Sequence, residues 1–209
     1  KVIDSLDEIN AIGHRVVHGG EVFKDSALIG EKEIEQIREC GEFAPLHNPA
    51  AALGMEACKK AMPGKPMVAV FDTTFHQTMS KERYIYPIPY QYYKKYSVRK
   101  YGAHGTSHMF VSRRLAEIEK ISLEGTKIVT CHLGQGSSIC AIKDGKSIDT
   151  SMGLTPLGGI PMVTRSGDLD PSILIYIMTK DKLTPEQMEN ILNKQSGVAG
   201  ISGLAPDFR

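Results

Sequence analysis

The stretch that decides the fold is KIVTCHLGQGSSICAI, residues 127–142. Its β-branched and small apolar residues predict one strand over residues 127–133 and a second over residues 138–142, joined by a tight turn at Gly134-Gln135-Gly136. Two interpretations of the turn stay open. It is an ordinary β-hairpin turn, or it is a row of outward N–H groups that binds a phosphate with the serine hydroxyls that follow. A single G-x-G does not decide between them, so the decision rests on the remainder of the chain.

Composition excludes several classes of function. The chain has 209 residues, 41% of them apolar, and a net charge of +1, so it can bury a core and has no bias towards nucleic acid or an anionic membrane. It contains no apolar run of membrane-spanning length and no signal-peptide pattern, which predicts a cytoplasmic protein. Its four cysteines are widely spaced without a C-x-x-C pair, and we expect them to be reduced core residues.

Strand and helix patterns alternate in the first third of the chain. They predict a strand over residues 11–17, an amphipathic helix over residues 31–40, and a helix that is capped by Asn48. The continuous apolar run MVAVF at residues 67–71 is typical of a strand buried on both faces. This alternation favours a mixed or parallel sheet with packed helices.

The middle of the chain holds a further helix that follows a glycine-punctuated loop. The pattern predicts the helix over residues 109–119, with Thr106 or Ser107 as its N-cap. Its apolar positions at helical spacing are expected to face the core: Val111, Leu115 and Ile118.

A tyrosine-rich segment at residues 84–101 also contains several lysines. Such a segment suits single-stranded nucleic acid or the packing of irregular connections. Because the whole chain is not basic, we favour packing and predict no nucleic-acid partner.

The loops, rather than the predicted helix faces, carry a set of polar residues. Its members are Arg15, His18, His47, Asp72, His104, His108, His132, Arg165 and Asp168. Each one alone has a structural alternative, such as a surface ion pair, a buried histidine or a turn aspartate. Together, beside a glycine turn, they suit phosphoryl transfer, which requires cations around the migrating group and a carboxylate near a metal ion.

Six motifs resemble those of the acetate kinase family, in the same order and spacing. They are GHRVVHGG (residues 13–20), APLHNP (44–49), FDTTFH (71–76), YGAHGTSH (101–108), HLGQGSS (132–138) and TRSGDLDP (164–171). The resemblance covers essentially the whole chain. It implies an α/β, two-domain ribonuclease H-like fold of the actin-like ATPase type, with mixed sheets and flanking helices.

The resemblance also implies an activity and its participants. The reaction would be reversible phosphoryl transfer from ATP to acetate, giving ADP and acetyl phosphate with Mg²⁺ or Mn²⁺, by a homodimer. Because acetate is already an anion at neutral pH, no general base is needed, and we predict direct in-line transfer without a phospho-enzyme.

Individual roles follow from the same resemblance. Arg15 and Arg165 would flank the phosphoryl group and the acetate carboxylate, since a guanidinium stays charged and binds two oxygens at once. His104 would stabilise the transition state, and His47 would support the acyl-phosphate site. Asp72 would hold Mg²⁺, directly or through water, or help to position Arg15.

Two further groups of residues complete the implied site. The acyl pocket would be lined by Val17, Leu46, Ala103 and Pro156. The nucleotide phosphates would be bound by His132, Leu133, Gly134, Gln135 and Gly136. Ala103 stands where many members of the family have a bulkier aromatic residue, which predicts a wider acyl pocket.

The implied domains are residues 1–75, the latter part of an N-terminal acyl-substrate domain, and residues 76–209, the first part of a C-terminal nucleotide-binding and dimerisation domain. The resemblance further implies a chain that is incomplete at both ends, with its main metal ligands elsewhere and little activity by itself. Two alternatives remain: a propionate or butyrate kinase of the same superfamily, and an actin-like or heat-shock-type module that only binds and hydrolyses nucleotide.

Overall fold

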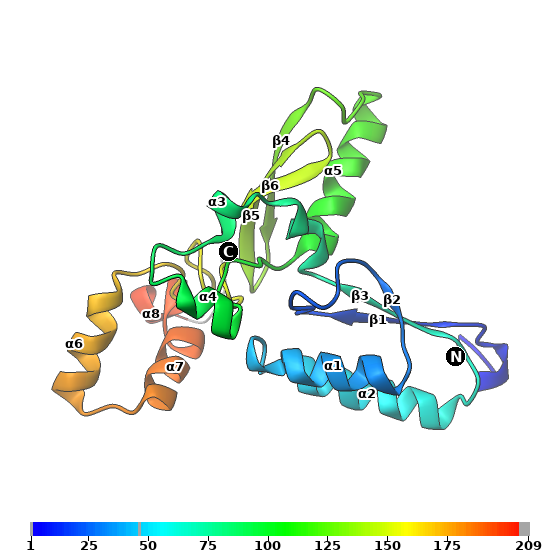
Figure 1. Cartoon of the computed structure of the whole chain (residues 1–209), viewed down its shortest axis with the longest axis horizontal. Coiled ribbons are helices and arrows are strands. Elements are labelled where there is room, and N and C mark those ends of the chain that lie inside the picture. The colour runs from blue at the N-terminus through cyan, green and yellow to red at the C-terminus, as the bar shows by residue number, and fades with distance from the viewer. Residues whose placement is uncertain (1, 46, 205–209) are drawn as a thin grey trace.

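The structure is a computed structural model that describes residues 2–45 and 47–204. Two small sheets, each flanked by helices, form the molecule (Figure 1). The strands are β1 (Ile12–Val16), β2 (Ala27–Leu28), β3 (Met67–Phe71), β4 (Lys127–Leu133), β5 (Ser137–Lys143) and β6 (Lys146–Thr150). The α-helices are α1 (Glu31–Glu39), α2 (Asn48–Ala61), α3 (Lys81–Tyr84), α4 (Gln91–Tyr96), α5 (Gly105–Glu119), α6 (Pro171–Asp181), α7 (Pro185–Lys194) and α8 (Gly197–Ser202). Three 3₁₀ turns are described as well: η1 (Leu6–Glu8), η2 (Cys40–Glu42) and η3 (Thr74–Thr78).

The first sheet has the strand order β1-β3-β2, with β1 parallel and β2 antiparallel to β3. Helices α1 and α2 lie side by side along one face of it (Figure 1). The apolar residues of this face form one buried cluster: Val16, Phe23, Ile34, Ile37, Ala52, Met55, Ala69 and Phe71. Successive side chains of a strand point to opposite faces, so Arg15 points away from the cluster that contains its neighbour Val16.

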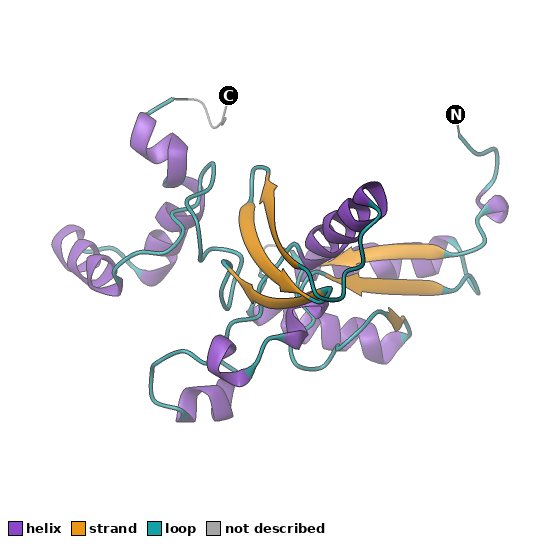
Figure 2. Cartoon of the chain, turned by 90° about the horizontal axis from the view of Figure 1, so that it is seen from above, coloured by secondary structure: helices purple, strands orange, loops and turns teal. Residues whose placement is uncertain are grey.

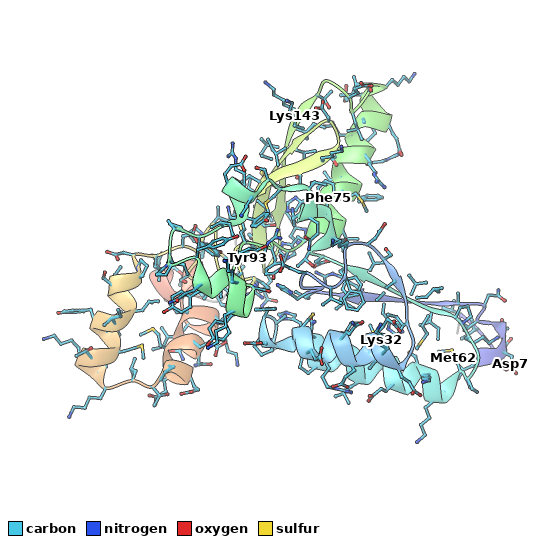
Figure 3. All side chains as sticks on the ribbon, in the orientation of Figure 1. Asp7, Lys32, Met62, Phe75, Tyr93 and Lys143 are labelled. Atoms are coloured by element: carbon cyan, nitrogen blue, oxygen red, sulfur yellow. The ribbon has the colours of Figure 1, made fainter. Side chains whose placement is uncertain are left out.

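The second sheet is an antiparallel meander in the order β4-β5-β6. Helix α5 runs beside β4, as the view from above makes clear (Figure 2). The glycine stretch therefore forms the expected hairpin, with its strands confirmed to within a residue. Phe75, labelled in Figure 3, lies at the junction of the two sheets and packs on the cluster of Ile128, Cys140 and Ile142.

The last three helices stand apart from both sheets (Figure 1). Helices α6, α7 and α8 form a separate group beyond the long irregular segment of residues 151–170 (Figure 1). A capping box begins α7, because the Gln187 N–H donates to Thr184 Oγ1 at 3.3 Å and the Thr184 N–H donates to Gln187 Oε1 at 2.8 Å. None of the helices within residues 2–45 and 47–204 is long and apolar enough to span a membrane.

Two predicted helix caps are wrong. His47, not Asn48, is the N-cap of α2, because the Asn48 side chain is buried and bonds the backbone of His18 instead. His104, not Thr106 or Ser107, is the N-cap of α5, and it adopts a left-handed conformation with φ of 59°. In both places a contact with a distant segment outweighs the local preference for a polar cap.

The predicted inner face of α5 is also wrong. Val111, Leu115 and Ile118 are exposed, whereas the buried positions at helical spacing are His108, Ser112 and Ala116. The reason is polar pairing, since His108 reaches hydroxyl groups on the second sheet. A hydrophobicity pattern cannot anticipate a helix that turns its polar stripe inwards.

Two further expectations are only partly met. In β3 one face is buried, but Val68 and Val70 on the other are only half-buried. All four cysteines are free, as predicted, yet only Cys40 and Cys140 are buried.

Candidate active site

The site begins with an ion pair at the shared end of two parallel strands. Arg15 lies opposite Val70 in the register of β1 and β3, so its side chain meets Asp72, which follows β3 directly. Arg15 Nε donates to Asp72 Oδ1 at 3.0 Å and Arg15 Nη2 to Asp72 Oδ2 at 2.5 Å. This bidentate pair raises the pKa of Arg15, through the hydrogen bond to Asp72.

Helix α5 starts against the same carboxylate. Thr106 Oγ1 donates to Asp72 Oδ1 at 2.9 Å, and the Gly105 N–H donates to the Asp72 carbonyl at 2.9 Å. Only glycine fits at 105, because a Cβ there would lie 2.2 Å from that carbonyl oxygen. The contact fixes where His104, the residue before the helix, is located.

His104 and Arg165 meet at the glycine turn. A Cβ added to Gly136 would lie 3.4 Å from His104 Nε2 and 3.4 Å from Arg165 Nη1, so both side chains border the same small space. The ring of His104 stacks on that of His132 with centroids 4.0 Å apart. Burial, with smaller contributions from His132, Arg15 and Arg165, lowers the pKa of His104 to about 4, so this imidazole is neutral at neutral pH.

The turn itself is held by short-range hydrogen bonds. The Gly134 N–H donates to the Gly136 carbonyl at 3.2 Å, and Ser137 Oγ donates to the Gly134 carbonyl at 3.0 Å. The Gln135 carbonyl accepts from the Val163 N–H at 3.4 Å, which joins the turn to the long loop. Leu133 ends β4 with its side chain exposed.

Arg165 is half-buried in the long loop. Its Nη1 donates to the Pro156 carbonyl at 3.0 Å. The backbone on either side of Arg165 is held as well, because the Ser166 N–H donates to the Leu192 carbonyl of α7 and the Ser196 N–H donates to the Thr164 carbonyl. Burial lowers the pKa of Arg165, although a guanidinium stays charged under all physiological conditions.

His47 borders the site from the first sheet's side. Burial, followed by the charges of Arg165 and Arg15, lowers its pKa, so these cations are close enough to act on the ring. His47, Pro156 and Arg165 line a cavity of about 250 Å³ together with Phe43, Ala44, Pro45, Thr155, Leu157, Glu189 and Asn193.

The four residues predicted to line an acyl pocket are not all together. Pro156 lines the cavity, but Val17 is half-buried on the edge after β1 and is not among the lining residues. Ala103 is buried against Met152 and Met162. Leu46 lies outside the described residues. The role of these positions in an acyl pocket stays a prediction.

Three histidines and an aspartate of the polar set have structural contacts. His18 is buried and its Nδ1 accepts from the Gly20 N–H at 3.1 Å. His132 Nδ1 lies 2.9 Å from Ser107 Oγ, and Asp168 Oδ1 accepts from the Gly159 N–H at 2.7 Å within the long loop. His108 is buried between Thr130 and Ser138.

Sequence reasoning missed two residues of the site. Thr106 was expected as a cap but bonds Asp72, and Asn48 was expected as a cap but holds the His18 backbone. Both contacts join segments 30 or more residues apart. No local pattern signals such a contact.

The described residues do not form a metal site by themselves. Within residues 2–45 and 47–204, no three histidine, cysteine, aspartate or glutamate side chains converge as ligands. Asp72 is the carboxylate of the site, and both of its oxygens already accept bonds from Arg15 and Thr106. An ion would therefore reach Asp72 through water or would displace one of these donors.

The fold and the side chains define a class of protein: an α/β protein with a partly buried cluster of arginine and histidine side chains beside a glycine turn. The chain belongs to the acetokinase family, whose pattern it matches over residues 1–209.

Individual relatives agree with this assignment. The chain is 60% identical over 208 residues to the acetate kinase of Caldicellulosiruptor saccharolyticus and 61% identical to that of Treponema denticola, covering 100% of this chain and 52% of each relative. The crystal structure of Porphyromonas gingivalis acetate kinase matches with a TM-score of 0.92 at 48% identity, over 98% of this chain and 51% of that one. A propionate kinase from Francisella tularensis matches with a TM-score of 0.91 at 52% identity, over 95% and 51%. The chain thus spans about half the length of the relatives it matches and shares their fold, as the sequence predicted.

Proposed function

We propose that this chain takes part in reversible phosphoryl transfer between ATP and acetate, which yields ADP and acetyl phosphate. The observation that carries the proposal is the convergence of His104 Nε2 and Arg165 Nη1 on Gly136, with Arg15 held nearby by Asp72. The high identity to acetate kinases supports acetate over longer acids as the acceptor.

The charges of the site suit two anions that must approach each other. Acetate and the terminal phosphate repel, and fixed guanidinium groups at Arg15 and Arg165 offset that repulsion where charge develops. The bond to Asp72 holds Arg15 in one orientation although 62% of its side chain is exposed. Because the guanidinium group is already in place, no free energy is needed to reorient it during the reaction.

His104 acts as a neutral donor in this proposal. Because its pKa is lowered to about 4, the ring is a neutral imidazole with one N–H and not an acidic imidazolium at neutral pH. Acetate is already an anion and needs no general base. Transfer is direct and in line, without a phospho-enzyme. Incubation with labelled ATP, followed by acid quenching, is expected to leave no label on the protein that chases into acetyl phosphate.

The remaining roles are proposed from the family resemblance. The cavity lined by His47 and Pro156 holds the methyl group. Val17, Leu46 and Ala103 keep the acyl-pocket role that the family resemblance implies. Residues 132–136 bind the phosphates of ATP. A bound divalent ion would supply further positive charge, and Asp72 is the carboxylate of this chain that would contact its hydration shell. Mg²⁺ or Mn²⁺, a homodimer and a cytoplasmic location belong to the same proposal.

The test is acyl-phosphate formation, trapped as hydroxamate, by the full-length protein with acetate, propionate and butyrate in parallel. We expect acetate to have the highest kcat/KM. A higher kcat/KM for butyrate than for acetate would show that the protein has a different acyl specificity. ATP hydrolysis without acyl phosphate from any of the three acids would contradict the proposal and favour a nucleotide-binding module.

Arginine-to-lysine variants test the two guanidinium groups. R15K and R165K each keep a positive charge but lose the two-point contact, and we expect kcat/KM for acetate to fall by about a hundredfold. R38K is the matched control, because Arg38 bonds Glu35 and Glu56 on the surface and should leave the rate unchanged. Equal rates for R15K, R165K and R38K would refute the roles assigned to these arginines.

A further inference from the structure

A buried chain of hydrogen bonds runs from the second sheet to His104. Thr130 Oγ1 lies 2.7 Å from His108 Nδ1, and His108 Nε2 lies 2.8 Å from Ser138 Oγ. Ser138 Oγ in turn lies 2.9 Å from His104 Nδ1. The members come from β4, α5 and β5, and we call Thr130, His108 and Ser138 the relay.

The relay couples the two imidazole rings through a single hydrogen. Ser138 exposes none of its surface, and the only partners of its hydroxyl among the described residues are His104 and His108. A hydroxyl has one hydrogen, so Ser138 donates to one ring and accepts from the other. Burial lowers the pKa of His108 to about 3, and that of His104 to about 4, so both rings are neutral and each carries one N–H.

Two arrangements satisfy these conditions. In the first, Thr130 donates to His108 Nδ1, His108 Nε2–H donates to Ser138, and Ser138 donates to His104 Nδ1. In the second, every bond is reversed, and His104 Nδ1–H starts the chain. The first leaves the His104 hydrogen on Nε2, and the second leaves Nε2 bare.

Thr130 distinguishes the two arrangements. Its side chain is buried, with 5% exposed, and its hydroxyl has no partner other than His108 within residues 2–45 and 47–204. In the second arrangement the buried Thr130 hydrogen would be left without an acceptor. In the first, every hydrogen of the three relay residues has an acceptor, and the one hydrogen outside the chain of bonds, on His104 Nε2, faces the space beside Gly136 from a residue that is only partly buried. An unused buried donor is costly, so the first arrangement is favoured.

We infer that Thr130, His108 and Ser138 are positioning residues that hold His104 as the Nε2–H tautomer, and so make it a hydrogen-bond donor towards the space beside Gly136 and Arg165. The inference rests on the proposed function for its kinetic consequence, but the tautomer itself does not. His104 Nε2 borders the Gly136 space together with Arg165 Nη1, so both present hydrogens to an anion there.

The tautomer is measured directly in the full-length protein labelled with ¹⁵N-histidine. Long-range ¹H–¹⁵N spectra separate a ring nitrogen that bears hydrogen from one that does not, and H104Q identifies the His104 signals by their loss. We expect hydrogen on Nε2 in the wild-type protein and a mixture of tautomers in T130V, which lacks the terminal hydroxyl. Hydrogen on Nδ1 in the wild-type protein would overturn the inference, whatever reaction the protein catalyses.

Kinetics test whether the tautomer matters. S138A removes the partner of His104 Nδ1, and we expect kcat for acetyl phosphate formation to fall about tenfold with the KM for ATP nearly unchanged, because the lost interaction acts in the transition state. T130V should lower kcat less, since the bond to His104 remains. T130S keeps the hydroxyl and should restore the wild-type rate and tautomer.

T126V is the matched control for T130V. Thr126 lies just before β4 and donates its hydroxyl to the Leu123 carbonyl at 2.6 Å, outside the relay. T126V should alter neither kcat nor the His104 signals. Wild-type kcat in both S138A and T130V would overturn the inference. If S138A does not fold, T130V and T130S still decide, because a purely structural hydroxyl would change stability without changing the tautomer.

Discussion

Asp72 exposes only 1% of its side chain, yet it carries a carboxylate. Burying such a group is costly unless it is paired, and here Arg15 and Thr106 supply the hydrogen bonds. The same pairing fixes the largely exposed Arg15 side chain, which would otherwise sample many rotamers. At the scale of single residues, the buried Asp72 carboxylate therefore holds the exposed Arg15 guanidinium in one orientation.

Gly136 provides a prediction at this scale. In G136A the new methyl group would lie 3.3 Å from His104 Cε1 and 3.4 Å from Arg165 Nη1, so both side chains must move by a few tenths of an ångström. We expect kcat to fall about tenfold, because donors aligned with the transition state tolerate little displacement. Steady-state kinetics of acetyl phosphate formation by the full-length protein measures the effect.

The stability of G136A should change by less than about 1 kcal/mol, because Gly136 is not among the glycines with a left-handed φ. G54A is the control, since its methyl group meets nothing within 4 Å on α2. A wild-type kcat in G136A would show that the space beside Gly136 is not used in the reaction.

At the scale of elements, the first turn of α5 connects the two sheets. His104 adopts the left-handed conformation, Gly105 contacts the Asp72 backbone, and Thr106 contacts the Asp72 carboxylate. The helix then turns His108 towards Thr130 of β4, buries Ser112 and leaves Phe110 and Ile118 exposed. The polar inner stripe of α5 is what holds the relay.

Gly105 provides a prediction at this scale. In G105A the Cβ would lie 2.2 Å from the Asp72 carbonyl oxygen, so the start of α5 must move away from β3. We expect a loss of about 2–3 kcal/mol in the free energy of unfolding, as for other overpacked sites, together with a large loss of activity. Urea denaturation measures the first and the hydroxamate assay the second.

The control is again a glycine inside a helix. G54A adds a methyl group in open space on α2 and should stabilise the protein by about 0.5–1 kcal/mol, because alanine favours helix more than glycine does. Equal stabilities for G105A and G54A would contradict the close approach at Gly105.

At the scale of the whole molecule, buried neutral histidines join the segments. His76 Nε2 donates to the Ala103 carbonyl at 3.1 Å, and its Nδ1 accepts from Ser147 Oγ at 2.8 Å, which joins η3, the loop before α5, and β6. Burial lowers the pKa of both His18 and His76 to about 4. Neither ring can be protonated without loss of its native environment.

These pKa values predict acid sensitivity. The unfolded chain binds protons to these histidines near pH 6.5 and the folded chain only near pH 4, so stability is complete above pH 6.5 and is lost as the pH falls from 6.5 towards 4. Each ring contributes a slope of up to about 1.4 kcal/mol per pH unit in that window. Urea unfolding should show a lower free energy at pH 5.5 than at pH 7, with little change between pH 7 and 8. A flat profile from pH 7 to 5.5 would contradict the burial of these rings.

The sequence by itself determined several of the elements and the family. The hairpin of β4 and β5, the strand β3 and the amphipathic helix α1 follow from local periodicity and glycine placement, which act within a few residues. Motifs such as HLGQGSS and TRSGDLDP identified the family, because a site needs particular residue types whatever the surrounding fold.

Only the tertiary structure decided which side chains meet. Asn48 bonds His18 rather than capping α2, Thr106 bonds Asp72 rather than capping α5, and His108 faces β4. Each contact spans more than twenty residues of chain, and its energy appears only when the two segments are brought together. Local propensities of about 1 kcal/mol are then overridden by buried polar groups that must be paired.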